Sequence, residues 1–118
     1  MDLESFRAYC LAKKGVEETF PFDEVTLVFK VMGKMFALTG LDSDTFTVNL
    51  KCNPEWAVEL RETYSEIQPG WHMSKIHWNT VDFTGELDEA FLRKLIDHSY
   101  DLVVNSLPKK LRETLNGF

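Results

Sequence analysis

The segment from Pro69 to Val81 carries the side chains of this chain that are best suited to binding or chemistry. It contains Trp71, Trp78, two of the three histidines, a lysine and an asparagine. Imidazole, ammonium and amide groups contact phosphates, metals and polar substrates, while exposed indole rings stack on flat ligands. The segment is therefore either a binding surface or an unusually polar part of the core. The sequence leaves open whether Trp71 is exposed.

Residues 75–81 fit a half-buried strand, because successive side chains of a strand point to opposite faces. This alternation predicts that Ile76 and Trp78 lie in the core, whereas Lys75, His77 and Asn79 lie in water. Lysines of the preceding strands add cations that could contact phosphate. The predicted nucleic-acid-binding residues are Lys30, Lys34, Lys51, His72, Lys75, His77 and Asn79.

The overall charge is unusual for a protein that binds nucleic acid. The chain of 118 residues has 13 Lys and Arg against 19 Asp and Glu, so its formal net charge is −6. A surface that binds phosphate must therefore be locally basic. Hydrophobic residues make up 44% and charged residues 27% of the chain, as in ordinary folded domains. We expect one domain that spans residues 1–118.

Features of membrane or secreted proteins are not evident. The apolar runs are far shorter than the roughly 20 residues that cross a bilayer. The first residues also lack the basic and apolar blocks of a secretory signal. We therefore expect a cytoplasmic protein that does not bind membranes. Cys10 and Cys52 do not form a CxxC motif, and they are predicted to be reduced, buried side chains.

Motifs for catalysis, metal binding and cofactor binding are also not evident. His72 and His77 are five positions apart, a spacing that suits neither one face of a helix nor one face of a strand. The chain has no GxSxG motif and no glycine-rich phosphate loop, and Gly33-Lys34 is typical of a hairpin turn. We therefore predict no catalytic residue, no metal and no cofactor.

The spacing of apolar residues predicts an α+β domain with the element order α-β-β-β-α-β-β-α. Alternation predicts strands at residues 25–31, 35–39 and 46–50, with two further candidates at 67–71 and 76–83. Helical spacing and capping residues predict helices at 2–14, from Asn53 to about residue 64, and from Asp88 to just before Pro108. A short final helix is expected at 109–116. The order predicts a two-layer domain, with an antiparallel sheet covered by helices on one face.

Five segments of the sequence form a recognisable set: Glu18–Phe22, Val28–Ala37, Leu50–Cys52, Pro69–Lys75 and His77–Thr80. Together these segments resemble the MmcQ/YjbR family, and the resemblance extends over essentially the whole chain. The resemblance implies a fold similar to that of type III secretion chaperones. It also implies a predicted role in binding DNA through a double-wing motif.

Three functional hypotheses follow. The first, which we prefer, is a small non-enzymatic domain that binds DNA weakly and mainly electrostatically through the residues named above. The second is a protein-interaction module of the chaperone-like fold, which binds a partner peptide or self-associates, so that the protein is a monomer or a weak dimer. The third is a small-molecule or enzymatic site around His72, His77 and Asn79.

Overall fold

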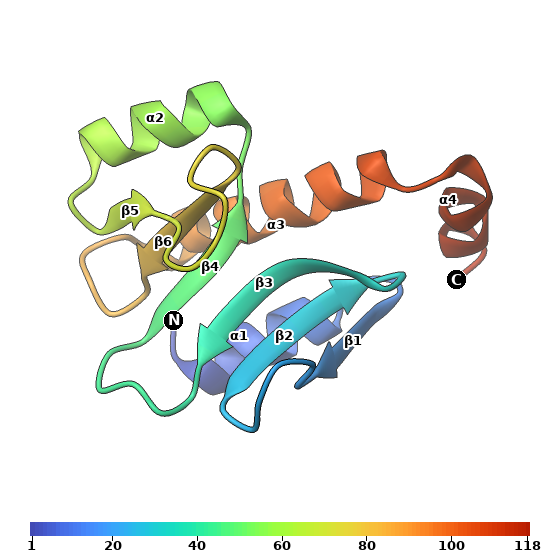
Figure 1. Cartoon of the computed structure of the whole chain (residues 1–118), viewed down its shortest axis with the longest axis horizontal. Helices are drawn as coiled ribbons and strands as arrows, with labels where there is room; N and C mark the ends of the chain where they lie inside the picture. The colour runs from blue at the N-terminus through green and yellow to red at the C-terminus, as the bar shows by residue number, and fades with distance from the viewer.

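The computed structural model describes residues 1–118, and its centre is one six-stranded antiparallel sheet (Figure 1). The strand order across the sheet is β1-β2-β3-β4-β6-β5. The strands are β1 (Val16–Thr19), β2 (Thr26–Val31), β3 (Lys34–Gly40), β4 (Thr47–Lys51), β5 (Ile67–Pro69) and β6 (Trp78–Asp82). The helices are α1 (Leu3–Leu11), α2 (Pro54–Thr63), α3 (Glu89–Ser106) and α4 (Lys109–Asn116). The predicted α+β class and its two layers are confirmed.

Three of the helices begin at side chains that cap their free N–H groups. The carboxylate of Asp2 accepts a hydrogen bond from Ser5 N at the start of α1, and that of Asp88 accepts one from Phe91 N at the start of α3. Asn53 caps α2 in the same way, and Pro54 occupies the first turn, where its missing N–H costs nothing. The predicted helix starts are therefore confirmed near these residues.

The N-terminal edge strand β1 was not predicted. Its residues Val16–Thr19 pair with β2, and Glu18 also forms an ion pair with Arg7 of α1. The sequence Val-Glu-Glu-Thr has only one apolar side chain, so it lacks the alternation that marks a strand. Backbone pairing with β2 is what makes this segment a strand.

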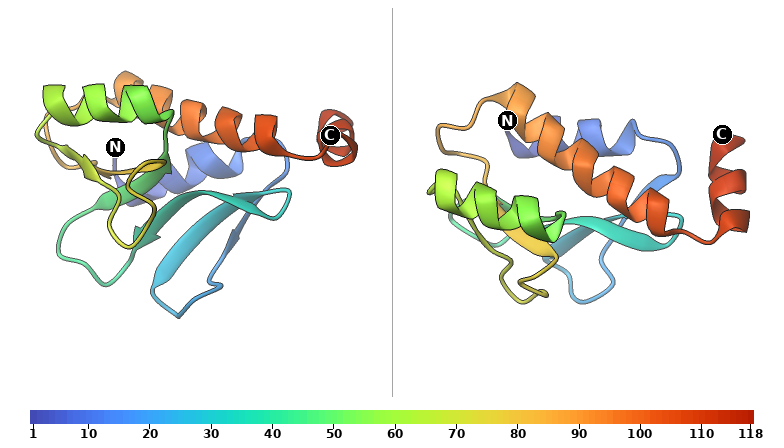
Figure 2. Two further views of the ribbon diagram at one scale, coloured as in Figure 1. Left: turned by 45° about the horizontal axis from the view of Figure 1, so that its top comes forward. Right: turned by 90° about the horizontal axis from the view of Figure 1, so that it is seen from above.

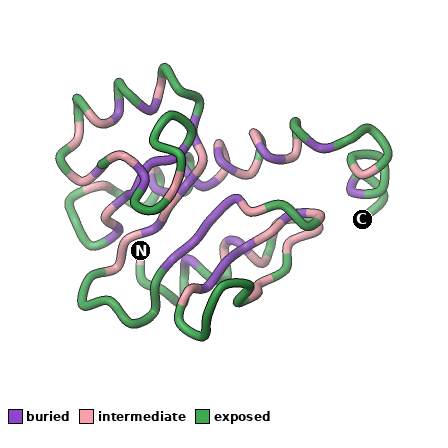
Figure 3. Tube along the Cα trace, in the orientation of Figure 1, coloured by how far each residue is buried: buried purple, intermediate pink, exposed green.

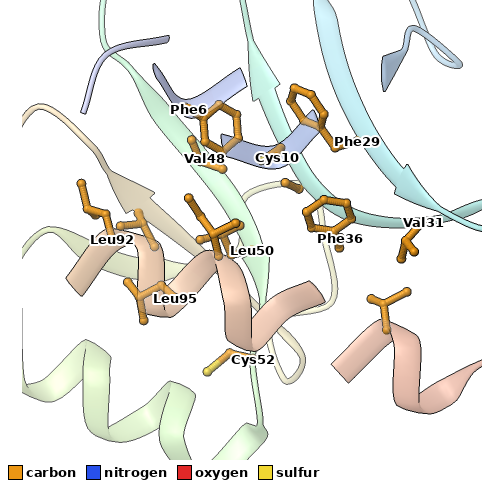
Figure 4. Close-up of a cluster of buried hydrophobic side chains, with 14 of the residues drawn as sticks. Phe6, Cys10, Phe29, Val31, Phe36, Val48, Leu50, Cys52, Leu92 and Leu95 are labelled. Atoms are coloured by element: carbon orange, nitrogen blue, oxygen red, sulfur yellow. The ribbon is translucent and has the colours of Figure 1, made fainter. Parts of the chain in front are cut away.

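The main core lies between the sheet and the helices α1 and α3 (Figure 4). Phe6 of α1 packs against Phe29 of β2 in an edge-to-face arrangement, with ring centroids 5.3 Å apart. Leu92 and Leu95 of α3 pack into the same cluster. Cys10 and Cys52 are both buried and are not linked by a disulfide, as predicted. The buried face of α3 is the predicted one, formed by Leu92, Leu95, Ile96, Ser99 and Val103.

A β-bulge in β3 is bridged by a serine of α3. Phe29 pairs with Ala37 but Lys30 pairs with Met35, so Phe36 is the extra residue in β3. The Ser99 hydroxyl donates to the Phe36 carbonyl at 2.5 Å and accepts from the Lys51 N–H at 2.8 Å. This fully buried hydroxyl therefore replaces the missing contact between β3 and β4.

The second face of the sheet is not covered by helices, and we call it the open face. Figure 2 shows that α1 and α3 lie on one side, while the β1–β2 and β5–β6 loops project on the other. These loops are largely exposed (Figure 3). No helix of the protein has both the length and the apolar character required to span a membrane.

Candidate functional site on the open face of the sheet

Residues 70–77, which we call the aromatic loop, fold over the open face. Gly70 N donates to Trp78 O at 2.8 Å, so the loop leaves β5 in close contact with β6. A Cβ atom on Gly70 would lie only 2.7 Å from the Cβ of Trp78 and 2.9 Å from its carbonyl oxygen. Glycine is therefore required at this position, because any larger residue would separate the loop from the strand.

Two polar side chains of the sheet hold the backbone of Trp71. Asn49 and Thr80 are cross-strand partners on β4 and β6. Trp71 N donates to Thr80 Oγ1 at 2.9 Å, and Asn49 Nδ2 donates to Trp71 O at 3.1 Å. Thr80 in turn donates its hydroxyl proton to Asn49 Oδ1. These bonds fix the backbone of the aromatic loop and leave the Trp71 indole free to extend outward.

The structure answers the question that the sequence left open for Trp71, which is 52% exposed. The next residue, His72, is also exposed and has φ +60°, a left-handed conformation that is uncommon for residues other than glycine. Met73 folds back and packs against a small cluster of Val28, Leu38 and Trp78 on the open face. The loop is therefore anchored through Met73 and presents Trp71 and His72 to solvent.

The predicted orientation of residues 75–79 is wrong in two respects. Ile76 was expected in the core but is 65% exposed, because residues 74–77 form a turn in which Trp78 N donates to Ser74 O at 2.9 Å. Asn79 was expected in water but is only 2% exposed. It lies opposite Leu50 on the helix-covered face, so β6 places Trp78 on the open face and Asn79 in the main core. The burial of Trp78 itself is confirmed.

Arg61 of α2 explains how an asparagine is accommodated there. Its Nε donates to Asn79 Oδ1 at 2.7 Å, and its Nη2 donates to the carbonyl of Lys75. The guanidinium therefore connects α2, β6 and the aromatic loop. The Asn79 Nδ2 group has no hydrogen-bond partner. Sequence reasoning missed Arg61, although its position one turn from the end of an amphipathic helix was the available signal.

Only some of the basic residues predicted from the sequence lie close together in the structure. Lys51 lies opposite Trp78, and Cys52 N donates to His77 O at 2.8 Å, so Lys51 and His77 are neighbours. Lys75 belongs to the same region, and its Nζ donates to Gly70 O at 3.0 Å. Lys30 lies on β2, across β3 from this group. Lys34 lies at the β2–β3 turn opposite Val31 of the main core, so it is on the helix-covered face of the sheet.

None of these lysines forms an ion pair with a carboxylate of the chain. The four ion pairs of the chain use Arg7, Lys13, Arg93 and Lys109. Glu17 is the cross-strand partner of Lys30, but the two side chains do not form an ion pair. The open face therefore carries ammonium groups that are available to an external anion.

A groove with a volume of about 590 Å³ lies beside this basic region. Phe22 and Asp23 of the β1–β2 loop line it together with Trp71, His72 and Met73 of the aromatic loop. Its floor and end are formed by strand residues and by the β3–β4 turn, among them Thr26, Leu38, Thr47, Asn49, Asp42 and Ser43. His72 thus belongs to this groove, whereas Lys51 and Lys75 do not. No group of three or more His, Cys, Asp and Glu side chains is placed to hold a metal ion.

Comparison with known proteins relates the chain to a family. The model of the YjbR family matches residues 11–102, a range that contains every strand of the sheet and all of the aromatic loop. The chain belongs to the YjbR family. The family resemblance inferred from the sequence is therefore confirmed.

Relatives in this family match the chain nearly from end to end. The uncharacterized protein YjbR of Escherichia coli (strain K12) is 35% identical over 115 residues, which cover 98% of both chains. The uncharacterized protein YbdF of Escherichia coli O157:H7 is 37% identical over 107 residues, 91% of this chain and 88% of YbdF.

Solved structures agree with the fold of this YjbR-family chain. The crystal structure of Deinococcus radiodurans protein DR2400, described with a DUF419 domain, has a TM-score of 0.90 at 38% identity. The match covers 97% of this chain and 87% of that protein. A crystal structure of a protein from Pseudomonas syringae has a TM-score of 0.74 at 28% identity, and the match covers 86% of this chain and 98% of that protein.

Proposed function

We propose that this YjbR-family protein is a non-enzymatic cytoplasmic protein whose open face binds DNA weakly through phosphate contacts. The observation that supports this proposal best is that Lys30, Lys51 and Lys75 form no ion pair in a chain with 19 acidic residues. An unpaired ammonium group on a helix-free face can exchange its counterions for phosphates, and the release of those counterions favours binding.

The contact residues proposed from the structure differ from the set predicted from sequence at three positions. Lys34 lies opposite Val31 and is on the helix-covered face. Asn79 is buried against Arg61 and is not available to a nucleic acid. His72 lines the adjacent groove rather than the lysine region. Lys51, Lys75 and His77 then form the centre of the proposed surface, and Lys30 extends it toward β2.

So few cations imply weak binding without sequence readout. If all three lysines contact phosphate, the logarithm of the affinity should fall with the logarithm of salt concentration with a slope of about −3 or shallower. The net charge of −6 repels DNA as a whole and weakens binding further. No helix projects from the open face as a recognition helix, so we propose no preference for particular bases.

Fluorescence anisotropy with labelled duplex and single-stranded DNA at several salt concentrations tests the proposal. We expect binding that weakens with salt, and a Lys51→Ala, Lys75→Ala double variant should reduce the salt slope by about 2. Glu17→Gln should strengthen binding, because it removes a negative charge opposite Lys30.

The matched control is a Lys14→Ala, Lys110→Ala variant, which makes the same change of charge at two exposed lysines that form no ion pair and follow or belong to the helices α1 and α4. Equal weakening in this control would show a general charge effect and contradict the proposed surface. An absence of binding at low salt, where phosphate contacts are strongest, would rule out DNA binding by the isolated protein.

A second candidate function, protein interaction, is favoured by exposed apolar side chains on the loops beside the open face. Phe20, Phe22, Trp71 and Ile76 are 47%, 63%, 52% and 65% exposed. Large exposed apolar groups often mark contacts with a partner peptide or a second copy. Sedimentation velocity over a wide concentration range tests whether two copies of the chain associate. A mass that rises with concentration in the native protein, but not in an Ile76→Ser variant, would support a weak dimer.

A further inference from the structure

We propose that the groove between Phe22 and Trp71 binds a small organic cation with an alkylated ammonium group. This inference is independent of DNA binding, because the groove and the lysine region use different side chains. Its volume of about 590 Å³ lies within the range of pockets that hold small ligands. The argument rests on the charge of the groove, on its aromatic side chains and on the fixed backbone that holds them.

The charge of the lining favours a cation. Asp23 and Asp42 line the groove, and no lysine or arginine does. The Asp23 carboxylate accepts hydrogen bonds from Val25 N, Thr26 N and the Thr26 hydroxyl, and these bonds, that from Val25 first, lower its pKa. Asp23 is therefore a fixed negative charge of the β1–β2 loop. Asp42 is exposed and its carboxylate forms no hydrogen bond or ion pair within the protein.

The apolar part of the lining favours alkyl groups on that cation. Phe22 and Trp71 line the groove and are 63% and 52% exposed, and Met73 lies between Trp71 and the sheet cluster. The faces of aromatic rings attract cations, and indole does so most strongly. An alkylated ammonium group can contact aromatic rings and carboxylates together, because its charge is spread over methyl groups that need little water.

The groove is built on supports that do not depend on a ligand. The Trp71 peptide is held from both sides by Asn49 and Thr80, as described above. The β1–β2 loop is held by the Asp23 turn, which fixes the residue next to Phe22. Both loops therefore hold the backbones that carry Phe22 and Trp71, so that mainly side-chain ordering is left to occur on binding a small ligand.

The two segments that form the groove lie more than forty positions apart in the chain, and both are among the segments that suggested the YjbR family. Glu18–Phe22 leads into the β1–β2 loop, and Pro69–Lys75 contains most of the aromatic loop. A phosphate-bearing ligand suits this groove poorly, because its lining contains two carboxylic side chains and no lysine or arginine. The same charge favours a cation over DNA at this end of the open face.

The test is an NMR titration with choline and with 3,3-dimethyl-1-butanol, the neutral molecule in which carbon replaces the nitrogen. The indole N–H resonance of Trp71, assigned with a Trp71→Phe variant, reports binding to the groove. We expect saturable shifts with choline and an affinity for the neutral analogue that is weaker by about five-fold or more. Asp42→Asn and Trp71→Ala should each weaken choline binding by about three-fold or more.

Matched controls test whether the effects on choline binding come from residues that line the groove or from residues near it. Asp44→Asn makes the same change of charge in the same turn, and Phe20→Ala removes an exposed aromatic side chain of the same loop, but neither residue lines the groove. Both variants, and the Lys51→Ala, Lys75→Ala variant, should bind choline as the native protein does. Equal affinity for choline and the neutral analogue, equal weakening by Asp44→Asn and Asp42→Asn, or no saturable shift would overturn the proposal.

Discussion

The Nε of Arg61 donates a hydrogen bond to Oδ1 of Asn79 at 2.7 Å, and this bond connects α2 to strand β6, which lies between β4 and β5. The same guanidinium donates to the Lys75 carbonyl, so α2 also holds the aromatic loop. Asn79 is buried and its Nδ2 has no partner, which makes Arg61 the one side chain that satisfies this amide.

Replacement of Arg61 should destabilise the protein. Arg61→Ala leaves the whole Asn79 amide buried without partners, which we expect to lower the free energy of unfolding by about 1–3 kcal/mol in urea denaturation. A double variant Arg61→Ala, Asn79→Leu removes both partners and should recover much of this loss. Arg112→Ala, which removes an exposed arginine that forms no ion pair, is the control. Equal losses in Arg61→Ala and Arg112→Ala would contradict the structural role of the bond.

Thr80 should control the order of the aromatic loop. Thr80→Val keeps the shape of the side chain but removes the acceptor for Trp71 N and the donor to Asn49. We expect the Trp71 amide to exchange with solvent deuterium at least about ten times faster, since the lost bond corresponds to about 1–2 kcal/mol. Amides of α3 provide the internal control. Uniform acceleration throughout the chain would instead indicate global destabilisation.

His98 should make stability depend on pH. Its Nε2 accepts a hydrogen bond from Asn53 N at 3.1 Å, at the residue that caps α2. Burial lowers the pKa of His98 below 6.5, although the carboxylate of Asp101 acts in the opposite direction. The unfolded chain therefore binds the proton more readily, so this contribution to stability is present above the unfolded pKa and is lost as the pH falls below about 6.5.

Urea denaturation between about pH 7.5 and pH 5.5 measures this effect around the ordinary histidine pKa. We expect the free energy of unfolding to fall toward the acidic end of this range. His98→Gln, which keeps a hydrogen-bonding side chain but does not titrate, should reduce the decrease. The exposed His72 provides the control, because His72→Gln should retain the decrease. Identical pH profiles for the native protein and His98→Gln would exclude His98 as the cause.

The two thiols should be unreactive in the folded protein. Burial raises the pKa of Cys10 to about 12 and that of Cys52 to about 11. The thiolate is the reactive form, so both cysteines should react very slowly with a disulfide reagent at about pH 8. In urea, which unfolds the chain, both cysteines should react rapidly. The absorbance of the thiol released from the reagent measures the rate of reaction. Fast reaction of one thiol in the native protein would show that its surroundings open readily.

Local sequence patterns predicted most of the fold because they report on local physics. Asn53-Pro54 and Asp88 mark helix starts by the capping bonds that they form. Val48 and Leu50 alternate with Thr47 and Asn49, and the structure buries the two apolar residues. β1 escaped prediction because its strand state comes from pairing with β2 and from the Arg7–Glu18 contact, neither of which leaves a local pattern.

The candidate site was predicted less completely, and the reason lies in the two faces of the sheet. Alternation in residues 75–81 shows which side chains share a face, but it does not show which face the helices cover. Trp78 was assigned to the core because it is large and apolar. The structure contains a second apolar cluster on the open face, and Trp78 belongs there, which places Asn79 in the main core.

By itself the sequence determined the α+β class, the helix starts, the absence of a membrane-spanning helix and the burial of both cysteines, because composition and local spacing decide these properties. The family followed from the resemblance of five motif segments. The tertiary structure decided where the chemistry lies. Only the folding of the aromatic loop onto Asn49 and Thr80 exposes Trp71, brings it to the same groove as Phe22 and separates His72 from Lys51 and Lys75. These relationships depend on contacts between residues distant in the chain, and such contacts have no signature in local spacing.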